Sequence, residues 1–263
     1  MEISTVNDIA VERSGNILSI QLNRPAKKNA MTSSMYVTIA ELLDAAATDD
    51  QVRVVLWHGA GDSFSAGNDL EDFMKNPPGP GESPQARLMR ALINLEKPLI
   101  AAVQGAAIGG GTTMLAHCDF VYAGESARFQ LPFVNLGLVP EFGSSYLLPL
   151  RFGYIGTANL VLLGQPFDAS RAAELGLVTE VVAEDKLLAT ATEIARTLAG
   201  KPPAAVQACK RLIKQAFREQ LEQAVKRENE EFAVRVRSDE AKEVFRAFFA
   251  KRQPASVPKN TAA

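Results

Sequence analysis

Three consecutive glycines, Gly109 to Gly111, constrain the fold of this 263-residue chain more than any other feature. The apolar run Leu99 to Val103 before them has the continuous Val, Ile, Leu and Ala character of a buried strand, and a helix is predicted after them, from Thr112 to His117. Glycines between a strand and a helix let a ligand approach the backbone, whose N–H groups point outward at the positive end of the helix dipole. The stretch favours an anion, either a phosphate or an oxygen that becomes negative during a reaction; a tight turn without a ligand gives the same pattern.

The composition narrows the class of protein. The chain is 47% hydrophobic and 22% charged with a formal net charge of −2, so it has no strong field that would attract nucleic acid. Neither a run of about 18 apolar residues nor a signal peptide is visible, which predicts a cytoplasmic protein without a membrane partner. Two histidines and two distant cysteines, Cys118 and Cys209, argue against a metal site and predict buried or half-buried free thiols.

Strand and helix patterns alternate through the first half of the chain. Apolar alternation on both sides of Ser14 to Asn16 predicts a hairpin, and a helix is expected from about Thr32 to Ala47. A buried strand over Val52 to Trp57 and a loop over Gly59 to Met74 follow, then a helix that ends at Lys97. Such alternation favours parallel βαβ units, whose binding loops gather at the carboxyl ends of the strands.

Two further segments are distinctive. The stretch Asn76 to Pro84 is rich in proline and glycine, which predicts either a lid over a pocket or a neutral surface insertion. From Pro202 onward the chain reads as charged helices, with an apolar face near the end that is more typical of a subunit surface than of a ligand site. That face consists of Val244, Phe245, Phe248 and Phe249.

Five segments, in their order along the chain, resemble the crotonase superfamily, the enoyl-CoA hydratases and isomerases. They are NRPAKKNAM (23–31), FSAGNDL (64–70), QGAAIGGGTTMLAHCD (104–119), AAELGLVTEVV (172–182) and FFAKRQP (248–254). The resemblance implies an α/β fold, a spiral of ββα units, with an acyl-CoA-binding core over residues 1–200 and a helical C-terminal trimerisation region over residues 201–263. It also implies a homo-oligomer, either a trimer or a dimer of trimers, and an acyl-CoA substrate with no separate cofactor.

The resemblance also assigns roles to residues. Two backbone amides hold the thioester oxygen in this family, and the matching positions here are Ala66 and Gly110; one such donor is typically worth roughly 10²–10³ in rate. The implied substrate- and CoA-binding residues lie on the surrounding loops. They are Lys27, Lys28, Ala30, Ser65, Ala66, Gly67, Asn68, Asp69, Leu70, Ile108, Gly109, Gly110 and Phe133. Lys27 and Lys28 suit phosphate groups, or they are solvated loop residues, and Lys251 is a further, weaker phosphate candidate.

The residues at the reaction centre depart from the hydratase pattern. Hydratases of this family use two glutamates, and the matching positions here are Thr113 and Phe133, neither of which can exchange protons with water. The string LGLVPEFGSSY instead resembles the Δ3,Δ2-enoyl-CoA isomerase branch, in which the residue matching Glu141 moves the proton. We expect Leu138, Phe142 and other apolar neighbours to raise the pKa of Glu141. The alternative is that Glu141 caps the helix that follows it.

The expected function is an isomerase that moves the double bond of a 3-enoyl-CoA to the 2-position through an enolate, in fatty acid degradation. The alternatives are an enoyl-CoA hydratase, an isomerase of ring or aromatic acyl-CoA, and a non-catalytic acyl-CoA-binding protein. A serine hydrolase using Ser144 or Ser145 is not expected, because the chain has no GxSxG elbow. We expect His117 to pack in the core and Asp119 to make a structural hydrogen bond.

Overall fold

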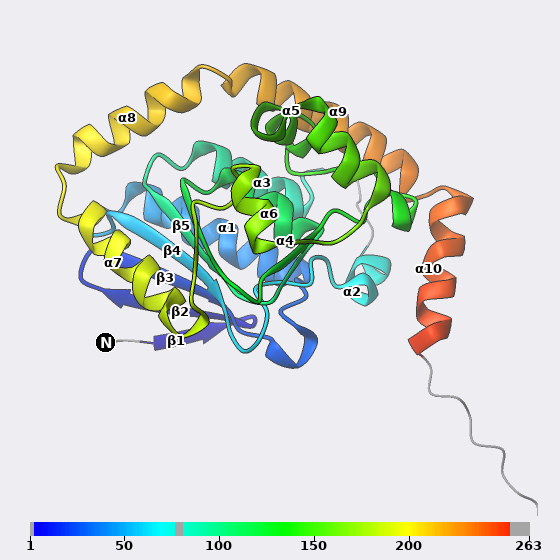
Figure 1. Ribbon diagram of the computed structural model, residues 1–263, viewed down its shortest axis with the longest axis horizontal. Helices are drawn as coiled ribbons and strands as arrows, with labels where there is room; N and C mark the ends of the chain where they lie inside the picture. Colours follow the sequence, from blue (N-terminus) through cyan, green and yellow to red (C-terminus); the bar gives the residue numbers. More distant parts are fainter. Residues whose placement is uncertain (1–2, 77–80, 253–263) are drawn as a thin grey trace, which may run out of the picture.

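The chain folds around two β-sheets of different size. The computed structural model describes residues 3–76 and 81–252 (Figure 1). Its strands are β1 (Ile3–Val6), β2 (Ile9–Ser14), β3 (Ile17–Leu22), β4 (Val54–Gly59), β5 (Leu99–Val103), β6 (Ala106–Ile108), β7 (Phe120–Gly124), β8 (Arg128–Gln130), β9 (Phe167–Asp168) and β10 (Glu180–Val182). The larger sheet has seven strands in the order β1-β2-β3-β4-β5-β7-β10, and the smaller has three in the order β6-β8-β9.

The larger sheet is antiparallel at one edge and parallel elsewhere. Strands β1, β2 and β3 pair antiparallel, and Ser14 lies opposite Ile17 in the β2-β3 hairpin. The pairs β3-β4, β4-β5, β5-β7 and β7-β10 are parallel. The predicted hairpin and the predicted parallel units are therefore confirmed. Parallel strands inside a sheet are buried on both faces, which explains why every residue of Leu99–Val103 is apolar and buried.

Helices cover both faces of the larger sheet. The helices are α1 (Ser33–Thr48), α2 (Leu70–Lys75), α3 (Pro84–Asn94), α4 (Gly110–Thr113), α5 (Ser144–Leu163), α6 (Ala169–Glu174), α7 (Leu187–Ala199), α8 (Pro203–Gln215), α9 (Arg218–Arg235) and α10 (Asp239–Arg252). Val55 and Trp57 of β4 belong to the core that α1 and α3 complete. Val54 and Leu56, on the opposite face, pack in the core that α7 completes. This alternation follows from the period of two along a strand.

Strand β6 of the smaller sheet directly precedes the glycine triplet. After β5 the chain turns at Gly105 into β6, which pairs parallel with β8, and α4 follows directly. A strand of each sheet and a helix thus form a ββα unit, as the crotonase resemblance implied. The separate strand β6 was not predicted, because three residues are too few to show a period.

The predicted start of the helix after the triplet was wrong. The helix begins at Gly110 rather than Thr112, and it tightens into a 3-10 turn over Met114–His117. Glycine has a poor helix propensity, so sequence pattern does not place a helix start there. Tertiary packing does: a Cβ atom on Gly111 would lie 2.6 Å from the carbonyl oxygen of Ser65, so the helix rests on that segment.

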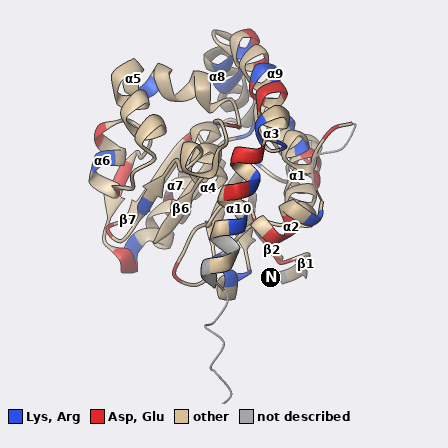
Figure 2. Cartoon of the chain, turned by 90° about the vertical axis from the view of Figure 1, so that its right-hand side faces the viewer, with Lys and Arg blue, Asp and Glu red and all other residues tan. Residues whose placement is uncertain are grey.

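The C-terminal helices form an arc over the core. In Figure 1, α8 and α9 run across the top of the molecule and α10 descends at its right-hand side. Charged residues of both signs are distributed along α9 and α10 (Figure 2), as the sequence indicated. Buried residues of α9 include Leu221, Ala224 and Glu228, so this helix packs into the body of the protein. The division at residue 200 stays a prediction.

One helix, α5, is long and apolar enough to cross a membrane by length and composition. Gly153 interrupts it with non-helical dihedral angles (φ 68°, ψ 169°), so it consists of two segments, each shorter than the roughly 20 residues that a membrane span needs. The first segment buries Ser144, Leu147 and Leu148. Several apolar side chains along α5 are exposed to solvent. They are Leu150, Tyr154, Ile155, Leu162 and Leu163.

Other local expectations had mixed outcomes. The strand expected from Val52 begins at Val54, and the loop expected up to Met74 contains the short helix α2. Cys118 is buried, but Cys209 is exposed, contrary to the expectation. The stretch Asn76 to Pro84, expected to be either a lid or a surface insertion, falls partly on residues 77–80, which lie outside the described residues. The side chains of Phe248, Phe249 and Lys251 also lie outside them.

Candidate active site

A cavity of about 760 Å³ opens between the loops that follow β3, β4 and β6, and residues of β8 and α9 complete its walls. Its lining includes every substrate-binding residue predicted from the sequence except Ser65. The predicted residues that line it are Lys27, Lys28, Ala30, Ala66, Gly67, Asn68, Asp69, Leu70, Ile108, Gly109, Gly110 and Phe133. Ser65 lies behind them and supports the wall, because its hydroxyl donates to the carbonyl of Asn29 and accepts from the N–H of Gly67.

The glycine triplet lies directly against the loop after β4. Gly67 has a φ of 81°, and a Cβ atom there would lie 2.5 Å from the carbonyl oxygen of Ile108 and 3.6 Å from the amide nitrogen of Gly110. The N–H of Gly109 donates to Gln130 at 2.9 Å. The N–H of Gly110, the first residue of α4, has no acceptor within residues 3–76 and 81–252. It is therefore available to a ligand at the positive end of the helix.

The second oxyanion donor predicted from the sequence, Ala66, was wrong. Its N–H donates to the carbonyl oxygen of Lys28 at 2.9 Å and is not free for a ligand. Asn68 is different: the bonds from Met31 N–H to Gly67 oxygen (2.7 Å) and from Asp69 N–H to Met31 oxygen (2.9 Å) flank it, and its own N–H has no acceptor in the described chain. Backbone N–H groups point in alternating directions along an extended segment, which explains why the N–H of Asn68 is free.

Glu141 lies next to Gly110, behind the first turn of α4 and behind the residues that line the cavity. Its side chain is 5% exposed, and its Oε1 lies 3.5 Å from the Thr113 hydroxyl, which donates to it, and 3.0 Å from where a Cβ atom on Gly110 would sit. Burial, and secondarily the negative charge of Glu228, raise the pKa of Glu141 to about 8. The predicted direction of this pKa shift is confirmed. A carboxyl group with this pKa can both accept and release a proton near neutral pH.

The turn that carries Glu141 has an unusual backbone. Phe142 and Gly143 both have positive φ, 59° and 68°, and the first of these is uncommon for a bulky residue. The carbonyl of Phe142 accepts a hydrogen bond from Nε2 of His117 at 2.7 Å. Burial lowers the pKa of His117 to about 3, so the ring is neutral with its proton on Nε2. The prediction that His117 packs in the core is confirmed.

The helix after this turn is capped by a different glutamate. Glu228 of α9 accepts hydrogen bonds from the N–H groups of Gly143 (2.6 Å) and Ser145 (2.7 Å) at the start of α5. The alternative that Glu141 caps this helix is therefore wrong. No serine triad forms either, because the imidazole of His117 is bonded to a carbonyl and the described chain offers Ser144 Oγ no partner.

Tyr36 of α1 supports the free amides from behind. Its buried hydroxyl donates to Oδ1 of Asn68 at 2.8 Å and lies 3.3 Å from where a Cβ atom on Gly110 would sit. Burial, and secondarily the charge of Glu141, raise the pKa of Tyr36 well above its usual value, so the hydroxyl keeps its proton. Sequence reasoning missed Tyr36 and Glu228, because Tyr36 fits the apolar pattern of α1 and Glu228 is one of many charged residues on α9.

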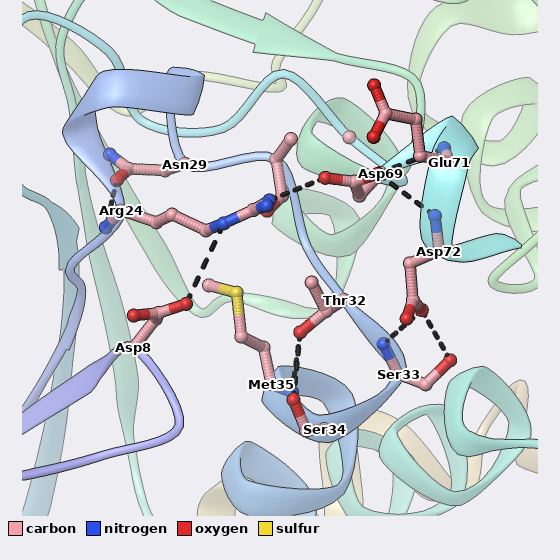
Figure 3. A network of polar contacts seen from close by, with 12 residues as sticks. Asp8, Arg24, Asn29, Thr32, Ser33, Ser34, Met35, Asp69, Glu71 and Asp72 are labelled. Carbon is pink, nitrogen blue, oxygen red and sulfur yellow. Dashed lines mark hydrogen bonds and ion pairs between the residues drawn. The ribbon is translucent and has the colours of Figure 1, made fainter.

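An ionic network joins the loop after β3 to the loop after β4 (Figure 3). Nη1 of Arg24 donates to Oδ2 of Asp69 at 2.6 Å and to the carbonyl of Ala30 at 3.0 Å, and its Nε lies 3.7 Å from Asp8. Asp69 also accepts from the N–H groups of Glu71 and Asp72 and so caps α2. Partial burial opposes ionisation of Asp69, but Arg24 and these N–H groups outweigh it and lower its pKa.

The cavity is lined by both charged and apolar side chains. Its charged lining residues are Lys27, Lys28, Asp69 and Glu71, all on the two joined loops. Neither lysine forms an ion pair within the described residues. The apolar lining includes an edge-to-face pair of Phe73 and Phe232, with ring centroids 6.0 Å apart. Among the described residues, no cluster of three His, Cys, Asp or Glu side chains is arranged to hold a metal ion.

Asp119 has a structural role, as predicted from the sequence. Asp119 accepts from the N–H of Leu99 at 2.7 Å and from Nζ of Lys210 at 2.6 Å. These bonds tie β5 to α8 and lie apart from the cavity lining.

Comparison with known proteins agrees with this geometry. A family model described as enoyl-CoA hydratase/isomerase matches residues 12–256. The 1,2-epoxyphenylacetyl-CoA isomerase of Escherichia coli is 36% identical over 245 residues, covering 90% of this chain and 94% of that protein. Enoyl-CoA delta isomerase 2 of Rattus norvegicus is 39% identical over 219 residues, 81% of this chain and 56% of that protein.

Solved structures share the fold. The crystal structure of an enoyl-CoA hydratase/isomerase from Pseudoalteromonas atlantica T6c is 42% identical, with a TM-score of 0.89 over 95% of this chain and 100% of that one. Proteins named as hydratases also occur among the relatives of comparable identity.

Proposed function

Because the chain belongs to the enoyl-CoA hydratase/isomerase family, we propose that it moves the double bond of a 3-enoyl-CoA to the 2-position, with Glu141 as its acid and base, in fatty acid degradation. The observation that carries this proposal is the position of Glu141, which is buried behind Gly110 at the free amides. The two hydratase positions hold Thr113 and Phe133, which cannot exchange protons with a water molecule.

The proton moves in two steps on one carboxyl group. The carboxylate of Glu141 takes a proton from C2 of the 3-enoyl thioester, and the electron pair of that C–H bond passes into a dienolate whose negative charge rests on the thioester oxygen. The N–H groups of Asn68 and Gly110 stabilise this charge, which is absent from the substrate. Glu141 then gives the proton to C4, which leaves a 2-enoyl thioester and restores the carboxylate.

The lining of the cavity indicates the kind of substrate. Lys27 and Lys28 meet the phosphates of coenzyme A as point charges. Phe73, Phe133 and Phe232 add an apolar surface to the same cavity. An apolar acyl chain is therefore the favoured substrate, because a charged end placed against these rings would lose its hydration without gaining a partner.

The test compares the wild-type protein with Glu141→Gln, using 3-enoyl-CoA and 2-enoyl-CoA separately. We expect the wild type to isomerise the 3-enoyl substrate, and the variant to lose about 10²–10⁴-fold in kcat with little change in KM. The matched control is Glu230→Gln, an exposed glutamate on α9. Rapid hydration of 2-enoyl-CoA that does not depend on Glu141 would contradict the proposal, and so would binding without turnover.

A second candidate is an isomerase of ring or aromatic acyl-CoA. The aromatic pair Phe73–Phe232 in the lining of the cavity favours it, because flat rings stack against such pairs. The same glutamate and the same free amides serve this reaction. An aromatic acyl-CoA with a displaceable double bond, assayed beside the 3-enoyl-CoA, distinguishes the two by the ratio of their kcat/KM values.

We also propose that the chain forms a homo-oligomer. The exposed apolar side chains of Tyr154, Ile155 and Leu162 on α5 support this proposal, because large apolar side chains exposed together on one helix are typical of subunit contacts. Sedimentation of the wild type and of Ile155→Lys tests it. A dissociated variant is expected, and a wild-type monomer would contradict it.

A further inference from the structure

We propose that Glu228 of α9 is a positioning residue: it holds the turn that carries Glu141, and its negative charge sets the pH range in which Glu141 works. This inference rests on the proposed role of Glu141 as acid and base. It gives a helix of the C-terminal region a part in the chemistry, although α9 follows the catalytic turn by about 80 residues and supplies no group that touches the reacting atoms.

Both hydrogen bonds of the Glu228 carboxylate go to the turn that leads from Glu141 into α5. Both of its carboxylate oxygens are used, at 2.6 Å from the N–H of Gly143 and 2.7 Å from the N–H of Ser145. The side chain is 6% exposed, so water does not replace these bonds. Burial raises the pKa of Glu228, and the hydrogen bonds from Ser145 and Gly143, with the positive end of α5, oppose this shift by favouring the ionised form.

The turn needs support from outside, because its own backbone is strained. A φ of 59° at Phe142 costs on the order of 1–3 kcal/mol, and a strained residue persists only where its surroundings fix it. His117 holds the carbonyl of Phe142, and Glu228 holds the N–H of Gly143 on the other side of the same peptide link. The direction of the Glu141 side chain, one residue earlier, depends on both bonds.

Close packing adds to these bonds. A Cβ atom on Gly143 would overlap Leu221 of α9 and lie 3.3 Å from Cγ2 of Val225. Helix α9 therefore rests directly on the turn, with Glu228 one helical turn beyond Val225. A residue other than glycine at position 143 would push the helix and its carboxylate away.

The charges around Glu141 are few. The groups that face it are the neutral hydroxyl of Tyr36 from α1, the hydroxyl of Thr113 from α4, and Glu228 from α9. The ring of His117 is neutral. Among the described residues, no cation acts on Glu141, so Glu228 supplies the one charge that disfavours its ionisation.

The experiment measures kcat/KM against pH with 3-enoyl-CoA for the wild type and for Glu228→Gln, Glu228→Asp and Glu230→Gln. Glutamine keeps one acceptor and removes the charge, so we expect the plateau to fall about tenfold and the acidic limb to move to lower pH by about one unit. Aspartate keeps the charge but is one methylene shorter, so its plateau falls and its limb stays near that of the wild type. Glu230→Gln changes neither quantity.

A readout without turnover separates this inference from the proposed function. The infrared band of the protonated Glu141 carboxyl, identified by its loss in Glu141→Gln, is titrated in the free wild-type and Glu228→Gln proteins. A midpoint that falls in Glu228→Gln supports the inference even if the wild type does not isomerise 3-enoyl-CoA. An unchanged midpoint and limb overturn it even if isomerisation is found. Should Glu228→Gln fail to fold, Glu228→Asp decides: a plateau equal to that of the wild type overturns the positioning role.

Discussion

The two sides of the cavity are held in different ways. The loops that carry Lys27 and Asp69 are joined by the Arg24 network, whose side chains are 11% to 54% exposed. The turn that carries Glu141 is held by His117 and Glu228, which are both 6% exposed. The first side is accessible to solvent and is held by ion pairs, so we call it the wet side. The second side, the dry side, is buried and is held by titratable groups whose pKa values are displaced. Changes on the first side should therefore alter binding, and changes on the second should alter chemistry and its pH dependence.

The largest expected effect concerns the dry side and is a dependence of stability on pH. Since the pKa of Glu141 is about 8 when folded and near 4.5 when unfolded, the native state binds more protons between these values, and stability falls as pH rises through this window. Glu141→Gln removes this penalty, so its stability relative to the wild type should increase between pH 4 and pH 9 by up to about 5 kcal/mol. Denaturant unfolding at both pH values measures it, and a constant difference would show that Glu141 titrates normally.

The next largest effect is expected at His117. Replacing His117 by alanine leaves the carbonyl of Phe142 without a donor and opens a cavity, so unfolding free energy should fall by about 2–4 kcal/mol. The kcat should fall as well, with KM nearly unchanged, because the turn loses one of its two supports. His58→Ala, on β4, is the control: its ring lies by Ser19 and away from the cavity, and it should leave kcat unchanged. Equal kcat losses in the two variants would show that the loss at His117 does not come from the support of the turn.

On the wet side, Asp69→Asn should raise KM about tenfold and leave kcat within a factor of two. The reason is that the substitution weakens the bond to Arg24, which joins two binding loops, but leaves Glu141 untouched. Steady-state kinetics check this prediction, with Asp49→Asn as control, since Asp49 pairs with Arg13 away from the cavity. A fall in kcat at constant KM would contradict the proposal that this side of the cavity affects binding and not chemistry.

The smallest effect is expected for the two lysines of the cavity. Lys27→Ala and Lys28→Ala should each raise KM by about two- to fivefold at low salt and by less at high salt, because exposed charge pairs are weak and screened. Titration of coenzyme A binding at two ionic strengths measures this, and Lys226→Ala, exposed on α9, should have no effect. A salt-independent loss would indicate a steric role for these lysines instead.

The sequence predicted the parts of the fold whose signal is local. The hairpin, the buried strand Leu99–Val103 and the helix after Thr32 each have a period and a boundary residue, and Thr32 does accept from the N–H of Met35 as a cap. The three-residue strand β6 and the start of α4 have neither, because contacts between loops determine them.

The candidate site was predictable to a similar extent. The lining residues follow from motifs, but Asn68 differs from Ala66 as a donor solely through the direction of its amide, which sequence does not encode locally. Glu228 lies 85 residues from the glycine that it holds, in a helix whose pattern is fully explained by charge and packing. A contact between residues so far apart in the chain produces no periodic pattern in the sequence, so the support of this turn could not be predicted.

The placement of α9 has a consequence for the time at which the protein becomes active during its synthesis. Glu141 and both free amides are translated well before Glu228 and Phe232 of α9. A nascent chain that has emerged only as far as α8 thus holds Glu141 and both free amides, but it lacks Glu228, which supports the turn, and Phe232, which lines the cavity. We therefore expect fragments that end before α9 to bind acyl-CoA poorly and to release it unchanged.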